Sequence, residues 1–324
     1  MEYLQLMVYF TLTPFLFLHV SKAEEIISTT ITVDLFGKGN FTSVQKAIDS
    51  IPSNNKLWTR IHVTAGIYRE KVEIPPDKPY IVLQGESSRL TFIQWGEFGD
   101  SGRSATFKLY ADNFVARDIT FENTYNHMLS SDVVTNVTWA PAALIQGDKA
   151  AFYRCGFLGL QDTLTDWQGR HFFNTCYIEG AIDFIWGGGQ SIYQDCFINV
   201  TKSRLGASGT AYITAQSRES EEDPNGFVFK YCAIRGSGPA FLGRAYRNHS
   251  RVVFYQSYFE NIIAPKGWDA WDTITFSEVK NIGPGADMLK RVKWVKHLPE
   301  KTLEKLVDIS FINAEGWIEN QPSY

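Results

Sequence analysis

The sequence lacks several features that mark particular classes of protein. It has no basic run or cluster of the kind that follows nucleic-acid phosphates, and its formal net charge is −4, so nucleic acid is not an expected partner. Beyond the N-terminus, no apolar segment is long enough to span a bilayer. No G-x-S-x-G motif occurs, which disfavours a hydrolase of the Ser-His-Asp type.

Cysteine is also scarce, with Cys155, Cys176, Cys196 and Cys232 among 324 residues. Four cysteines are too few for a disulfide scaffold. Their spacing does not match the C-x₂₋₄-C pairs of a zinc site, and we expect no metal or cofactor. Because cysteine behaves as a small apolar residue, we expect Cys155 and Cys176 to pack in a core. A disulfide between Cys196 and Cys232 is a less favoured alternative.

The N-terminus is the one long apolar stretch. Leu4–Val20 is mostly apolar, and small residues follow up to Ala23, which predicts a secretory signal over residues 1–23 and a secreted, extracellular protein. An uncleaved anchor is the alternative. The secretory route agrees with four N-x-S/T glycosylation sequons. These sequons begin at Asn40, Asn136, Asn199 and Asn248.

Short apolar strands recur about every 20 residues around the cysteines, with apolar residues before each cysteine and one two positions after it. A further segment carries Ser257 in the cysteine position. This period excludes helical arrays, and the Leu and Asn ladder of leucine-rich repeats is missing. We therefore predict an all-β fold, a parallel β-helix whose equivalent residues stack about 4.7–4.9 Å apart. The segments are 151–159, 172–180, 192–200, 227–236 and 252–261.

The two ends of the chain differ from this repeat. Val44–Pro52 has helical spacing, a cap at Thr42 or Ser43 and a final proline, so we predict a short N-terminal helix that closes the coil stack. Met288–Leu306 is Lys-rich and helix-compatible, and we predict a C-terminal helical or loop segment that covers the stack. No linker divides the chain, so residues 24–324 are expected to form one domain.

Two aspartates follow the same interval as the cysteines. Asp162 and Asp183 lie 21 residues apart, each seven residues after a cysteine, which predicts neighbouring positions on adjacent coils. Two carboxylates that close resist joint ionisation, so one pKa should rise and the pair should divide into a proton donor and an anion. The alternative is that both aspartates are turn residues exposed to solvent. The apolar neighbours Leu160 and Phe184 and the run Gly187–Gly189 favour a site.

The chain resembles the pectinesterases of plants over nearly its whole length after the signal. The resemblance implies a right-handed parallel β-helix, hydrolysis of galacturonate methyl esters in cell-wall pectin with release of methanol, and a monomer. It also implies a protein inhibitor as a partner. We expect no N-terminal inhibitor-like pro-region, which many relatives carry. The matching segments are VDLFGKGNFTSVQKAIDSIP (33–52), HVTAGIYREKV (62–72), ARDITFENT (116–124), GDKAAFYRCGFLGLQDTLTD (147–166), IEGAIDFIWGG (178–188), FLGRAYR (241–247) and FINAEGW (311–317).

The same resemblance assigns roles to individual residues. Asp183 matches the nucleophile that forms an acyl-enzyme. Asp162 matches the general acid and later base, and Gln161 matches an amide donor to the oxyanion. Arg244 matches the arginine that pairs with the nucleophile and keeps it ionised. Tyr246 stands where the family usually has a tryptophan that stacks on galacturonate.

Several positions depart from the family pattern. Trp139 stands 22 residues before Gln161, where the family usually has a second glutamine, and Trp186 replaces the usual phenylalanine. The usual partner of Cys155 is absent, which predicts a free thiol there. Trp268 and Trp271 are expected either to line the groove or to pack in the core.

Three functions are compared on these residues. The first is an active pectinesterase acting on methylesterified homogalacturonan. The second is a catalytically impaired pectin-binding protein of the cell wall, because loss of one oxyanion donor commonly costs about 10²–10³ in turnover. The third is another β-helix enzyme, a polygalacturonase or a pectate lyase. The intact set Asp162, Asp183, Gln161 and Arg244 favours the first.

Overall fold

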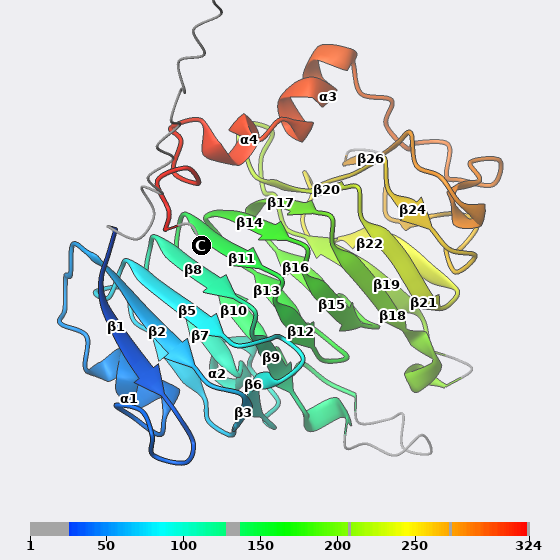
Figure 1. Ribbon diagram of the computed structural model, residues 1–324. Coiled ribbons are helices and arrows are strands. Elements are labelled where there is room, and N and C mark those ends of the chain that lie inside the picture. The colour runs from blue at the N-terminus through cyan, green and yellow to red at the C-terminus, as the bar shows by residue number, and fades with distance from the viewer. Residues whose placement is uncertain (1–25, 128–136, 207–208, 272–273, 323–324) are drawn as a thin grey trace, which may run out of the picture.

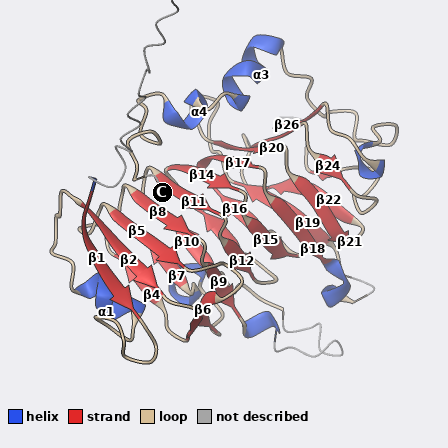
Figure 2. Cartoon of the chain, viewed as in Figure 1, coloured by secondary structure: helices blue, strands red, loops and turns tan. Residues whose placement is uncertain are grey.

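The chain winds into a right-handed parallel β-helix (Figure 1), as crossovers between parallel strands almost always do. The computed structural model describes residues 26–127, 137–206, 209–271 and 274–322. Each full coil gives one strand to each of three parallel sheets, and strands pair with their equivalents one coil away. Figure 2 shows that strands make up the body, with short helices at its ends and in its loops. The predicted fold class is confirmed.

We call the three sheets the long sheet, the site sheet and the third sheet. The long sheet comprises β1 (Ile27–Val33), β2 (Trp58–Val63), β5 (Ile81–Gly85), β8 (Phe114–Arg117), β11 (Ala150–Tyr153), β14 (Arg170–Asn174), β17 (Gln190–Gln194), β20 (Gly226–Lys230), β23 (Arg251–Tyr255) and β26 (Thr275–Val279). The site sheet comprises β4 (Val72–Ile74), β7 (Phe107–Leu109), β10 (Ala143–Ile145), β13 (Leu164–Asp166), β16 (Ile185–Gly187), β19 (Ala211–Gln216), β22 (Ala240–Ala245) and β25 (Trp268–Asp269). The third sheet comprises β3 (Gly66–Tyr68), β6 (Thr91–Trp95), β9 (Thr120–Asn123), β12 (Gly156–Leu158), β15 (Tyr177–Gly180), β18 (Phe197–Thr201), β21 (Ala233–Ser237) and β24 (Tyr258–Phe259).

A ladder of aromatic rings fills the interior behind the long sheet. Its members are register partners on successive strands, Phe152, Phe173, Tyr193, Phe229 and Phe254. Their ring centroids lie 4.9, 4.6, 4.5 and 4.5 Å apart in turn, close to the strand spacing of a sheet. The stacked rings therefore hold each coil in register with the next.

The cysteines form a second interior ladder, as their spacing predicts. All four are buried free thiols, so Cys155 is free as expected and the alternative of a bridge between Cys196 and Cys232 is wrong. The Sγ atoms of Cys176, Cys196 and Cys232 each donate to a backbone carbonyl of the preceding coil at 3.4, 3.5 and 3.3 Å. Burial raises the pKa of Cys176, which keeps this donor protonated. Ser257 continues the ladder, and its Oγ accepts from the Cys232 amide at 3.1 Å.

The N-terminal helix forms where the sequence predicts it. Helix α1 (Val44–Asp49) begins after Ser43, whose Oγ accepts a hydrogen bond from the Lys46 amide at 3.3 Å, as a helix cap does. Its buried face closes the end of the coil stack beside β1, β2 and β4. The other short helices are α2 (Ser101–Ser104), η2 (Tyr125–His127), η4 (Lys202–Leu205) and η5 (Pro284–Ala286).

The C-terminal segment covers the long sheet, as predicted, first as loop and then as helix. Residues 288–299 form turns and loops, and the helices are α3 (Glu300–Val307) and α4 (Ser310–Asn313). Helix α3 begins directly after Pro299, which stands at its cap and disfavours helical geometry at the residue before it. Leu306 and Trp317 bury against the outer face of the sheet, and α3 and α4 lie beside β14, β17 and β20 (Figure 1). Among the described residues, no helix has the length and apolar character needed to cross a membrane.

A buried polar cluster ties the site sheet to the long sheet. Asp166 accepts from the Tyr193 hydroxyl at 2.6 Å and contacts one ring nitrogen of His171. The other ring nitrogen lies 2.9 Å from the carbonyl oxygen of Gly147. All three side chains are fully buried, and Gly189 leaves room for them, because a Cβ there would lie 2.0 Å from Asp166 Oδ1.

Replacement of Asp166 should therefore destabilise the fold strongly. In Asp166→Ala the buried His171 and Tyr193 lose their shared acceptor, and we expect the free energy of unfolding to fall by about 3–5 kcal/mol. Equilibrium urea unfolding measures this. Asp49→Ala is the matched control on the exposed surface of α1 and should change it by no more than about 0.5 kcal/mol. Equal effects of the two variants would contradict the role of the cluster.

Candidate active site

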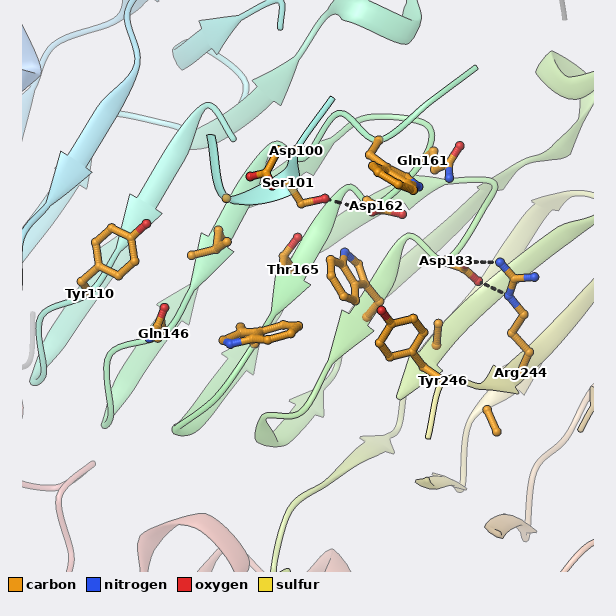
Figure 3. Close-up of a pocket in the computed structure, with 17 residues that line it drawn as sticks. Asp100, Ser101, Tyr110, Gln146, Gln161, Asp162, Thr165, Asp183, Arg244 and Tyr246 are labelled. Atoms are coloured by element: carbon orange, nitrogen blue, oxygen red, sulfur yellow. Dashed lines mark hydrogen bonds and ion pairs between the residues drawn. The ribbon is translucent and has the colours of Figure 1, made fainter. Parts of the chain in front are cut away.

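A groove of about 800 Å³ lies over the site sheet. Figure 3 shows Tyr110 and Gln146 at one end of it, Asp183 and Arg244 at the other, and Ser101, Asp162 and Thr165 between them. The lining residues are Asp100, Ser101, Gly102, Tyr110, Trp139, Leu144, Gln146, Gln161, Asp162, Thr165, Trp167, Asp183, Trp186, Ala215, Arg244, Ala245 and Tyr246. All five candidate residues of the sequence are among them.

The two aspartates occupy neighbouring coils, as their interval predicts. Gln161 forms a parallel bridge with Ile182, and the Asp162 amide donates to the Ile182 carbonyl at 3.0 Å. Asp162 and Asp183 both have left-handed backbones, with φ of +59° and +47°, which aspartate tolerates better than most residues. The aspartates therefore stand just before β13 and β16, where each coil turns into the site sheet. The alternative of two solvated turn residues is wrong.

Asp162 is the more buried of the two carboxyls, with 6% of its surface exposed. Burial, followed by the charge of Asp183, raises the pKa of Asp162 to about 8. Its one polar contact in Figure 3 is the Ser101 hydroxyl, which donates to Oδ2 at 3.2 Å. This hydrogen bond favours the carboxylate and opposes the rise. At neutral pH Asp162 thus holds its proton.

Asp183 is paired with Arg244, as expected. The Arg244 Nε donates to Oδ1 at 2.9 Å, and its NH2 group donates to Oδ2, so the guanidinium and carboxylate meet edge to edge. Burial raises the pKa of Asp183, and the hydrogen bonds and charge of Arg244 oppose that rise. The two carboxyls therefore differ in their partners: Asp162 faces a hydroxyl, while Asp183 faces a cation.

Gln161 lines the groove beside these carboxyls, and Trp139 lies one coil before it. The Ala140 amide donates to the Gln161 carbonyl at 3.4 Å, which confirms the position given to Trp139. The indole is half exposed and lines the groove. Gln146 is the other side-chain amide of the lining, and Figure 3 places it beside Tyr110, at the end away from Asp183. Gln161 is thus the single lining amide near the aspartates.

Aromatic rings form one wall of the groove. The Trp186 ring lies edge-on to Tyr246, with centroids 5.7 Å apart, and edge-on to Trp167 at 5.5 Å. Tyr246 is 46% exposed. Trp167 was not predicted from the sequence, although it follows the QDTLTD motif directly. Such a wall offers ring faces and edges to the apolar faces of a sugar.

The two other tryptophans proposed for the groove lie elsewhere. Trp268 is 1% exposed, and its indole nitrogen donates to Glu278 at 2.9 Å, so the core alternative is correct for it. Trp271 is exposed and is not among the lining residues. Within the described ranges, no group of three or more His, Cys, Asp or Glu side chains is placed to hold a metal ion.

Comparisons with known proteins agree with this geometry. The sequence model of the family described as Pectinesterase matches residues 30–315. Probable pectinesterase 29 of Arabidopsis thaliana is 48% identical over 309 residues, which cover 93% of this chain and 92% of that protein. The structure of pectin methylesterase from carrot has a TM-score of 0.84 at 31% identity and covers 90% of this chain and 95% of its own. The enzyme from Aspergillus niger has a TM-score of 0.77 at 27% identity, with 90% and 96% covered.

The raised pKa of Asp162 has a consequence for stability. The pKa of Asp162 is near 8 in the folded protein and about 4 in the unfolded chain. The wild-type protein therefore loses stability as pH rises from about 4 to about 8. Asparagine does not titrate. Asp162→Asn should therefore raise Tm, with a gain that is small near pH ~4 and grows until pH ~8.

Differential scanning calorimetry across this pH window measures the effect. Asp49→Asn on the exposed surface of α1 is the matched control and should leave Tm unchanged at every pH. A gain that does not depend on pH would contradict the protonation state given to Asp162.

Proposed function

The chain belongs to the pectinesterase family, and we propose that Asp183 and Asp162 carry out its ester hydrolysis as nucleophile and general acid–base. It is a carboxylic ester hydrolase that acts on the methyl esters of galacturonate in pectin. The observation that carries the residue assignment is the unequal pair itself. A carboxyl with a pKa near 8 lies one coil from a carboxylate that is held by an arginine.

The first half of the reaction forms an acyl-enzyme. One Oδ atom of Asp183 attacks the ester carbonyl carbon, and the carbonyl electrons move to the oxygen. The side-chain amide of Gln161 donates a hydrogen bond to this oxyanion. When the carbonyl reforms, the bond to the methoxy oxygen breaks and Asp162 gives that oxygen its proton, so methanol leaves. Asp183 is then joined to the substrate as an anhydride.

The second half restores the enzyme. Asp162, now a carboxylate, takes a proton from water, and the water oxygen attacks the substrate carbonyl of the anhydride. The bond to Asp183 breaks, which releases the galacturonate carboxyl and regenerates the Asp183 carboxylate. Arg244 stabilises the Asp183 carboxylate, which is the attacking group in the first half and the leaving group in the second. Asp162 ends protonated, as it began.

The other two candidate functions are weaker. The catalytically impaired reading rested on Trp139, but Asp162, Asp183, Gln161 and Arg244 converge on one groove, and that reading finds no support. Membership of the family argues against a polygalacturonase or a lyase, because those enzymes cleave the backbone of the polymer.

The remaining assignments extend the proposal to binding and location. Methylesterified homogalacturonan would lie along the aromatic wall with a sugar face on Tyr246. We also propose a secreted monomer of the cell wall with residues 24–324 as its domain, and a protein inhibitor as a partner. The signal over residues 1–23 and the sequon at Asn136 lie outside the described residues. Asn40 and Asn248 are exposed, while Asn199 is half-buried.

Substitution of the aspartates tests the assignment. Asp183→Ala removes the nucleophile and should lower methanol release from methylated pectin by at least about 10³-fold. Asp162→Ala removes the proton donor and should cost about 10²–10⁴-fold. Asp49→Ala should release methanol at the wild-type rate. Normal activity in both site variants would refute the assignment.

The pH profile tests which carboxyl carries the proton. Activity needs protonated Asp162, so kcat/KM should fall as pH rises through about 8. Because the Ser101 hydroxyl stabilises the carboxylate, Ser101→Ala should raise the pKa of Asp162 and move this alkaline limb to higher pH. An alkaline limb that moves to lower pH would show that the hydroxyl favours the protonated form.

A further inference from the structure

Arg244 has a second contact besides Asp183. Its guanidinium carbon lies 4.5 Å from the centre of the Tyr212 ring, within the range of a cation–π interaction. Tyr212 belongs to β19, and its amide donates to the Ala181 carbonyl at 2.8 Å. Tyr212 therefore stands on the coil that directly follows the Asp183 loop. The arginine lies between the carboxylate of one coil and the ring of the next.

Tyr212 is itself held in place from two sides. Its hydroxyl donates to Asp269 Oδ2 at 2.8 Å. Its ring stacks on Phe241, with centroids 5.4 Å apart and planes 15° apart. Burial, with Asp269 adding to the effect, raises the pKa of Tyr212 to about 12, so the hydroxyl remains a donor. The ring is thus a fixed surface for the guanidinium.

Arg244 needs such a surface because its side chain is 43% exposed. An exposed arginine has many rotamers, and holding one of them costs conformational entropy. The edge-to-edge bond with Asp183 requires the guanidinium in a single plane. The Tyr212 ring covers one face of that plane. Tyr212 is not among the groove-lining residues, so a change there reaches the reaction through Arg244.

We propose that Tyr212, backed by Asp269, is a positioning residue that holds Arg244 in the orientation the nucleophile requires. The inference rests on the proposed function in one respect, the role of Asp183 as nucleophile. Asp269 is also the register partner of Arg244 between β22 and β25. Arg244 therefore lies near two acids: Asp183, with which it pairs, and Asp269, which holds the Tyr212 ring.

The charged and titratable groups around Arg244 determine the effect on pH dependence. Asp183 is its partner, Asp162 lies within reach of its charge, and Tyr212 and Asp269 face it from β19 and β25. Loss of the ring loosens the guanidinium, so Asp183 loses part of the interaction that favours its ionised form. The acid limb of kcat/KM should then move to higher pH.

The test compares Tyr212→Leu with Tyr177→Leu. Tyr177 is the matched control, because its ring stacks on Phe197 at 5.7 Å and its hydroxyl donates to Glu179 at 2.7 Å, as in the Tyr212 arrangement. It lies on the third sheet. We expect Tyr212→Leu to lower kcat about tenfold with KM within about twofold, and to shift the acid limb upward. Tyr177→Leu should stay within about twofold of wild type.

Two further variants keep the test independent of folding. Tyr212→Phe retains the ring and its stack on Phe241 but loses the bond to Asp269, so its kcat should lie between those of wild type and Tyr212→Leu, above about a third of wild type. In an Arg244→Lys background, which lacks the planar fork, Tyr212→Leu should cost less than about twofold. Wild-type kcat and pH profile in Tyr212→Leu, or the same cost in both backgrounds, would overturn the inference. Failure of the proposed function is recognised separately, by full methanol release in Asp183→Ala.

Discussion

The burial of two carboxyls on adjacent coils, with the repulsion between their charges added to it, governs the site. Coils of a parallel β-helix are separated by about 4.7–4.9 Å, and at that distance in a poorly solvated groove both groups cannot ionise cheaply. The surroundings decide which one keeps the proton. Asp162 accepts a hydrogen bond from the Ser101 hydroxyl and has a pKa near 8, whereas Asp183 has the two hydrogen bonds and charge of Arg244. The same position on two successive coils would thus supply both the acid and the nucleophile of the proposed reaction.

The interior ladders of rings and thiols keep successive coils at this spacing. Rings such as Phe173 and Tyr193 stack 4.6 Å apart in register, and the thiols bond from coil to coil. Because each rung fixes the next, a residue at a given place in one coil has a predictable neighbour in the following one. The cluster around Asp166 adds a polar tie between the site sheet and the long sheet, only four residues beyond Asp162.

The sequence predicted those parts of the site that follow the repeat. The 21-residue interval placed Asp162 beside Asp183, and the family resemblance supplied Arg244. Ser101 was missed because it lies 61 residues before Asp162, in a loop helix outside the repeat. Tyr212 was missed because its coil is longer: it follows Asp183 by 29 residues, so the interval gave no register. The sequence predicted a C-terminal segment of helix or loop, and it did not locate the boundary between the two, which lies at Pro299.

The central claim is that Asp162 holds a proton while Asp183 does not, and neutron diffraction observes this directly. Crystals of the deuterium-exchanged wild-type enzyme, grown near neutral pH, would show nuclear density for a deuteron on a carboxyl oxygen. The account predicts a deuteron on Asp162 and none on Asp183, with the Arg244 guanidinium fully deuterated. A deuteron on Asp183, or an Asp162 without one, would contradict the assignment of acid and nucleophile.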